Sequence, residues 1–191
     1  MIKSYGVQNL KNIKGKSLEK ALNNQIVTNG EYYKQFEKKI SKTLNSKYAV
    51  VCNNGTSALM MAILALELKN LTVIIPNINF VASANIISLL KGKIILCDVD
   101  KKTGMVDLKS FKEILKKCKI KKLRPNLFIP IHYAGDVLDL KEMNKICVKE
   151  KISIIEDGCH SFGSFKKFEK KISVGDCTFS KLTTFSFHPV K

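Results

Sequence analysis

The sequence predicts an α/β fold, a mostly parallel β-sheet flanked by helices. Short apolar runs alternate with helical stretches through most of the chain, which is the pattern of βαβ units. The 191 residues, 45% of them hydrophobic and 26% charged, suit a globular domain with a sizeable core. None of the apolar runs reaches the roughly 20 residues that span a bilayer, so no membrane partner is expected.

The predicted elements follow in chain order after a loose N-terminal arm at residues 1–16. Helices are predicted at Ser17–Asn24, at Gly30–Leu44, and near 56–69, 80–91, 107–118 and 139–150. Strands are predicted at Tyr48–Cys52, Leu71–Ile75, Lys93–Cys97, Leu127–Ile131, Ile152–Ile155 and Leu182–Ser186, with a small hairpin at Phe165–Phe168 and Lys171–Val174. Right-handed crossovers would gather the loops that follow the strands along one edge of the sheet, where ligands bind.

The net charge of +17 raises the question of a nucleic-acid partner. Two features argue against one. Arg124 is the only arginine, although arginine is the preferred side chain for bidentate phosphate and guanine contacts. The lysines are spread along the whole chain, as on a solvated surface. We therefore expect no nucleic-acid partner, and keep a basic binding module as the less favoured alternative.

The cysteines and the N-terminus both indicate a cytoplasmic protein. The six cysteines form no CxxC pair and mostly fall in apolar runs, which favours reduced core thiols over disulfides or a metal site. The first residues contain no apolar stretch typical of a signal peptide.

The stretch NNGTSALMMAILAL predicts an anion site at the start of a helix. The helix is apolar almost all round and is therefore expected to be buried, so its first amides and its positive dipole end would attract an anion. Gly55 would let the backbone come close, and the hydroxyls of Thr56 and Ser57 would add donors. The alternative is an ordinary helix start capped by Asn54 or Thr56.

Two further loops carry candidate ligand-binding residues. Phe80, in IIPNINFVASAN, is either a stacking surface for a flat ligand or a core residue. Asp157, in IIEDGCHSFGS, ends a buried strand, where a carboxylate is costly unless it is paired, so we expect a functional role. His160 either orients that carboxylate, binds a ligand oxygen, or is a satisfied structural histidine.

The last residues, TFSFHPVK, bring Ser186 at a strand end and Lys191 in a turn. A lysine that is partly desolvated at the ligand-binding edge of the sheet has a lowered pKa and is nucleophilic toward an aldehyde. The alternative is that Lys191 is an ordinary surface lysine, one of many in this chain. Together these candidate residues match the chemistry of pyridoxal 5′-phosphate (PLP). Its phosphate needs helix amides and hydroxyls, and its ring needs an aromatic face. Its ring nitrogen needs a buried aspartate, and its aldehyde needs a lysine.

Seven stretches of the sequence resemble the DegT/DnrJ/StrS sugar aminotransferases, which are fold-type-I PLP enzymes. They are TNGEYYKQFEKKI, NGTSAL, IPNINFVASAN, CDVD, IHYAGDVLDL, IEDGCHSFGS and SFHPVK, in that order. Asn79 stands where the family usually has Ser or Thr. The resemblance implies the family's large domain over 17–191, with a C-terminal small domain absent.

The resemblance also implies roles for these residues. Lys191 would bind the cofactor covalently and shuttle protons. Asp157 would pair with the pyridinium nitrogen, and His160 would lie near the ring oxygen. Phe80 would stack on the cofactor ring. The residues at the phosphate would be Gly55, Thr56, Ser57 and Ser186.

The family transfers an amino group, usually from glutamate, to a nucleotide-linked keto sugar. The wording of IHYAG and GCHSFGS is most similar to members that act on a UDP-4-keto-6-deoxy HexNAc, toward pseudaminic or related nonulosonic acids of surface polysaccharides. A homodimer is implied, in which the second subunit completes the site. A dehydratase subgroup has histidine in place of the lysine, and Lys191 speaks against it.

Family members are about twice as long as this chain, which ends at the implied cofactor lysine. The remainder includes an antiparallel strand that lies between the first strand and the last one present here. Without it, Tyr48–Cys52 would have no hydrogen-bonded neighbour on that side. An inactive remnant, or one half of a split enzyme, is therefore the alternative to an active aminotransferase.

Overall fold

A computed structural model describes residues 15–23, 30–167, 169 and 171–189. Its main sheet has five strands in the order β2-β1-β3-β4-β7, and every pair of neighbours is parallel. The strands are β1 (Thr72–Pro76), β2 (Lys93–Cys97), β3 (Leu127–Phe128), β4 (Ser153–Asp157) and β7 (Leu182–Thr184). The helices are α1 (Gly15–Leu22), α2 (Glu31–Leu44), α3 (Gly55–Ala65), α4 (Val81–Leu89), α5 (Leu108–Ile120) and α6 (Lys141–Glu150). The predicted α/β class is confirmed.

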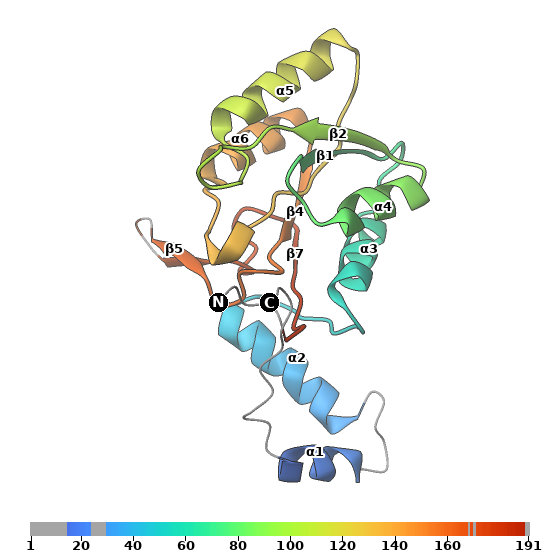
Figure 1. Cartoon of the computed structure of the whole chain (residues 1–191), viewed down its shortest axis with the longest axis vertical. Helices are drawn as coiled ribbons and strands as arrows, with labels where there is room; N and C mark the ends of the chain where they lie inside the picture. The colour runs from blue at the N-terminus through green and yellow to red at the C-terminus, as the bar shows by residue number, and fades with distance from the viewer. Residues whose placement is uncertain (1–14, 24–29, 168, 170, 190–191) are drawn as a thin grey trace, which may run out of the picture.

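Helices cover both faces of the sheet, as Figure 1 shows. Strand β1 is buried along its whole length, and its side chains alternate between the two faces. Ile74 packs with α5 and α6, whereas Val73 and Ile75 pack with α3 and α4. Burial on both faces explains why the strands appear in the sequence as short, continuous apolar runs.

A small antiparallel hairpin stands apart from the main sheet. Its strands are β5 (Phe165–Lys167) and β6 (Lys171–Ser173), paired from Phe165 opposite Ser173. The hairpin predicted from the sequence is therefore confirmed, although Phe168 lies outside the described residues. In Figure 1 the hairpin projects to one side of the body. A single turn of 3-10 helix, η1 (Tyr133–Gly135), follows β3.

The predicted strand Tyr48–Cys52 is wrong. The segment has no regular secondary structure and pairs with none of the described strands. Side chains of α2 bind its backbone instead: Glu37 Oε1 accepts from the Val51 N–H at 2.9 Å, and the Tyr33 hydroxyl donates to the Val51 carbonyl at 3.0 Å. A strand needs a neighbouring strand to satisfy its backbone groups, and none lies beside this segment in the part of the chain that the structure describes.

Two expectations about helices also need correction. Helix α3 is not buried all round: Leu59 and Ile63 are buried, but Met61 and Leu64 are exposed. The helix also ends at Ala65 rather than near residue 69, because Glu67 adopts a left-handed backbone conformation (φ 49°) that a helix cannot contain. Among the described helices, none is long and apolar enough to cross a membrane.

The cysteines are all unpaired, as the sequence predicts. Cys97, Cys118 and Cys147 are core residues between the sheet and the helices α5 and α6. Burial raises the pKa of Cys97 and of Cys147 to about 12, so both thiols stay protonated at neutral pH.

Candidate functional site

The carboxyl edge of the parallel sheet gathers the loops that carry the predicted site residues. Phe80 follows β1, His160 follows β4, and Ser186 follows β7. In open α/β sheets this edge is where ligands bind. Helix α3 packs against β4 and β7, which brings its N-terminus to the same region.

The start of α3 resolves the alternatives for its cap. Asn54 is the N-cap residue, and its side-chain oxygen accepts from the Ser57 N–H at 2.8 Å. Thr56 is therefore not the cap. The amides of Gly55 and Thr56 lie outside this bond, at the positive end of the helix dipole, and the hydroxyls of Thr56 and Ser57 lie beside them in sequence.

Gly55 lies in close contact with two loops that are distant in the sequence. A Cβ atom at Gly55 would lie 3.2 Å from Ser186 Cβ, 3.3 Å from Cys159 Sγ and 3.4 Å from the Phe185 carbonyl oxygen. These distances are at or below ordinary van der Waals contact. The glycine therefore allows the helix start, the loop after β7 and the loop after β4 to meet. The two candidate anion-binding segments and the loop that follows Asp157 converge there.

Asp157 is held rigidly at the end of β4. Its residue exposure is 5%, and its Oδ1 accepts from the Cys159 N–H at 3.0 Å. Its own N–H donates to the Pro130 carbonyl at 2.9 Å, and its carbonyl accepts from the His132 N–H at 3.0 Å. The sequence argument that this carboxylate is buried and partnered is confirmed.

His160 lies against the turn η1. The Ala134 N–H donates to His160 Nδ1 at 3.4 Å, and the Tyr133 ring centroid is 5.9 Å from that of His160. Since Nδ1 accepts, the proton of the neutral ring is on Nε2. His160 is therefore able to donate a hydrogen bond from Nε2 to an oxygen acceptor.

Phe80 is not a core residue, so that alternative is wrong. It is the N-cap residue of α4, and 59% of its surface is exposed. Its neighbour Asn79 has a buried amide nitrogen, Nδ2, that lacks a hydrogen-bond partner among the described residues. The sequence showed Asn79 as a departure from the family pattern but gave no sign of this donor.

A largely apolar groove of about 540 Å³ lies between α2, residues 46–54, α3 and β7. Gly55 and Ser186 line it, together with Met61, Phe185 and Phe187. Phe80, Asp157 and His160 do not line this groove. The structure therefore brings Gly55 and Ser186 together with Cys159, in the loop that follows Asp157. Phe80 lies at the same edge of the sheet, in the loop after β1. Lys191 lies outside the described residues.

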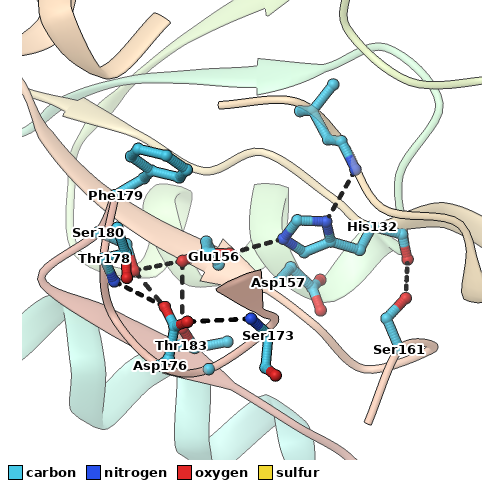
Figure 2. A network of polar contacts seen from close by, with 12 residues as sticks. His132, Glu156, Asp157, Ser161, Ser173, Asp176, Thr178, Phe179, Ser180 and Thr183 are labelled. Atoms are coloured by element: carbon cyan, nitrogen blue, oxygen red, sulfur yellow. Dashed lines mark hydrogen bonds and ion pairs between the residues drawn. The ribbon is translucent and has the colours of Figure 1, made fainter. Parts of the chain in front are cut away.

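A buried polar network next to Asp157 was missed by the sequence argument. Figure 2 shows its centre, His132 and Glu156, with Ser180 and Thr183 on the far side of Glu156. His132 and Glu156 are 24 positions apart, and the loop IHYAG gave no local sign of their pairing. The one available signal was Glu156, a second carboxylate beside Asp157 at the end of the apolar run Ile152–Ile155.

Solved structures show the same class of fold. The chain matches PseC of Helicobacter pylori, an aminotransferase involved in the biosynthesis of pseudoaminic acid. The TM-score is 0.81 at 26% identity, over 98% of this chain and 48% of that one. It also matches a Streptococcus pneumoniae protein described as a sugar aminotransferase in its PLP form, with a TM-score of 0.82 at 21% identity, over 99% and 50% of the two chains. The fold is that of the large domain of fold-type-I PLP-dependent transferases.

The chain belongs to the DegT/DnrJ/EryC1/StrS aminotransferase family, whose model matches residues 8–191. It is 31% identical over 188 residues to the UDP-4-amino-4,6-dideoxy-N-acetyl-beta-L-altrosamine transaminase of Campylobacter jejuni, across 98% of this chain and 48% of that protein. The chain thus spans about half the length of the curated relatives it matches. The aminotransferases of this family use PLP, and the resemblance found in the sequence motifs is confirmed.

Proposed function

We propose that this chain carries the PLP-binding residues of an aminotransferase that acts on a nucleotide-linked keto sugar. One observation carries the proposal. Gly55 at the start of α3, Ser186 after β7 and Cys159 two residues after Asp157 meet within van der Waals distance of a single point. The proposed phosphate-binding and ring-binding segments therefore converge at one sheet edge.

The donors and acceptors present suit the chemistry of PLP. The amides of Gly55 and Thr56, with the hydroxyls of Thr56, Ser57 and Ser186, supply donors for a phosphate at a helix N-terminus. The buried carboxylate of Asp157 suits a protonated ring nitrogen. The exposed ring of Phe80 offers a stacking face.

Each residue then has a defined task. When bound, PLP supplies the electron sink that amino-group transfer requires. Asp157 would hold a proton on the ring nitrogen, and His160 would donate from Nε2 to the ring oxygen. Lys191 would bind the cofactor covalently and shuttle protons. The role of Lys191 rests on the family motif SFHPVK, because that residue lies outside the described part of the chain.

The substrates and partners of the whole protein follow from its relatives. We propose glutamate as the amino donor and a UDP-4-keto-6-deoxy HexNAc as the acceptor, in the cytoplasm, with a homodimer as the working unit. Support comes from two relatives: the Campylobacter protein is a UDP-4-amino-4,6-dideoxy-N-acetyl-beta-L-altrosamine transaminase, and the Helicobacter protein is an aminotransferase involved in the biosynthesis of pseudoaminic acid.

Borohydride trapping tests the proposal directly. The purified chain is incubated with PLP, reduced with borohydride, digested and analysed by mass spectrometry. We expect a pyridoxyl mass on Lys191, loss of that adduct in Lys191→Arg, and its retention in the matched control Lys181→Arg. If no adduct forms on Lys191, either in the chain alone or with the downstream polypeptide co-expressed, the proposal is refuted.

The open groove supports a second candidate, in which a further polypeptide segment covers it. Val50 and Met61 are exposed, and the backbone of residues 48–52 pairs with none of the described strands. A second polypeptide that fills this groove would complete the sheet. Co-expression that turns an insoluble or non-binding chain into a soluble PLP-binding complex would support this candidate, and persistent insolubility would favour an inactive remnant.

A further inference from the structure

His132 contacts both segments that carry the proposed ring-binding groups. Its backbone N–H donates to the Asp157 carbonyl at 3.0 Å, and its carbonyl accepts from the Ser161 hydroxyl at 3.0 Å. Ser161 directly follows His160. One residue thus bonds to both ends of the turn from 157 to 161, and the side chain of this residue is 1% exposed.

The ring of His132 is fixed in one tautomer. Its Nδ1 accepts from the Leu138 N–H at 3.1 Å, so Nδ1 carries no proton. The ring proton is therefore on Nε2, which lies 2.7 Å from Glu156 Oε2 and donates to it. Figure 2 shows the ring of His132 directed toward Glu156, with the bond between them as a dashed line.

Glu156 in turn is bound on its other oxygen. The hydroxyl of Ser180 donates to Oε1, and the hydroxyl of Thr183 lies 3.4 Å from the same atom. Glu156 is 6% exposed, and a buried carboxyl group needs hydrogen-bond partners of this kind to offset the loss of water. The network ties the loop after β3 to β4 and to the start of β7.

The geometry points to His132 as a positioning residue for Asp157 and His160, an inference that rests on the proposed function. Successive residues of a strand point to opposite faces, so Glu156 anchors β4 on one side while Asp157 faces the other. Figure 2 shows the two carboxylates leaving β4 in different directions. The ring of His132 fixes its own backbone, and that backbone fixes the carbonyl of Asp157.

The same residue sets the place of His160 by a second route. Ala134, two residues after His132, adopts a left-handed conformation (φ 54°) and donates its N–H to His160 Nδ1. Such a conformation is unfavourable for alanine and persists only where its surroundings hold it. A shift of His132 would move this donor and change the tautomer or orientation of His160.

Nuclear magnetic resonance of the ligand-free chain tests the inference. His132→Asn shortens the side chain so that it no longer reaches Glu156. We expect shifts in the carboxyl carbon of Asp157 and the ring nitrogens of His160, and we expect PLP affinity to fall by about tenfold, as for partners one contact removed from other sites. His132→Gln places an amide donor near the Nε2 position and should restore both readouts in part. Cys118→Ala, a buried core change in α5, is the control for lost stability.

The outcomes separate clearly. If His132→Asn moves the Asp157 and His160 signals no more than Cys118→Ala does, the inference is overturned. Should the variant fail to fold, the unmodified chain still decides, because the His132 ring must show the Nε2–H tautomer and an Nδ1–H tautomer would overturn the inference. A chain that never binds PLP contradicts the proposed function, whereas the ligand-free signals still test the role of His132.

Discussion

Replacing Gly55 with alanine tests the proposed phosphate site, because the substitution should affect PLP binding more than folding stability. The new Cβ would lie 3.2 Å from Ser186 Cβ and 3.3 Å from Cys159 Sγ, which is tighter than most real contacts, so these neighbours must move by a few tenths of an ångström. Overpacking of this kind costs about 1–3 kcal/mol. Replacing a glycine in a conformation that alanine tolerates returns about 0.4–1 kcal/mol. We therefore expect a net destabilisation of about 0–2.6 kcal/mol.

The expected effect on PLP is larger than the effect on folding. The added methyl group pushes Ser186 away and blocks the close approach of a phosphate to the Gly55 amide, so affinity should fall at least tenfold, or about 1.4 kcal/mol. Urea unfolding followed by circular dichroism gives the stability, and titration with PLP gives the affinity. Gly15→Ala is the matched control, since Gly15 also begins a helix but has open space around it. Unchanged PLP affinity in Gly55→Ala would refute the proposed phosphate site.

Three further predictions concern the buried cysteines, residues 48–52 and the positive net charge. Burial raises the pKa of Cys97 and of Cys147 to about 12, so the unfolded chain releases these protons at lower pH than the folded chain does. The free energy of unfolding should therefore fall between about pH 9 and 12. A variant with both cysteines changed to alanine should lose that part of the pH dependence. Tyr33→Phe removes the bond to the Val51 carbonyl, so amide exchange in residues 48–52 should accelerate while exchange in β1 does not, and equal acceleration in both would contradict this account. The lysine-rich surface should bind duplex DNA weakly even at low salt, and tight binding that falls steeply with salt would restore the nucleic-acid alternative.

Local patterns account for the parts of the fold that the sequence predicted well. The apolar run Lys93–Cys97 is β2 to the residue, and the helix predicted near 107–118 is α5, which begins after the N-cap Asp107. Asp107 caps through its own side chain, by accepting from the Ser110 N–H three residues on. Such signals lie within a few residues of the structure they specify, so they are legible in the chain itself.

Non-local pairing explains what the sequence argument got wrong. Tyr48–Cys52 has the composition of a strand, but a strand forms only beside another, and that choice depends on residues far away in the chain. For Phe80 the sequence left two alternatives open, a stacking surface and a core residue, and only the structure showed that this N-cap residue of α4 is exposed. Composition alone does not distinguish these outcomes.

The sequence by itself determined the fold class, the order of the elements and the family, and it placed Gly55 and Asp157 at the ends of the right elements. These features depend on periodicity, capping and motif order, which are properties of the linear chain. The predicted strand Leu182–Ser186 was too long, because β7 ends at Thr184 and Ser186 lies in the loop after it. The tertiary structure alone decided that Ser186 and Cys159 occupy the space a side chain at Gly55 would need, and that His132 and Glu156 form one buried pair beside Asp157. Those contacts join residues from separate strands and loops, and they exist only once the parallel sheet has brought the ends of its strands to one edge.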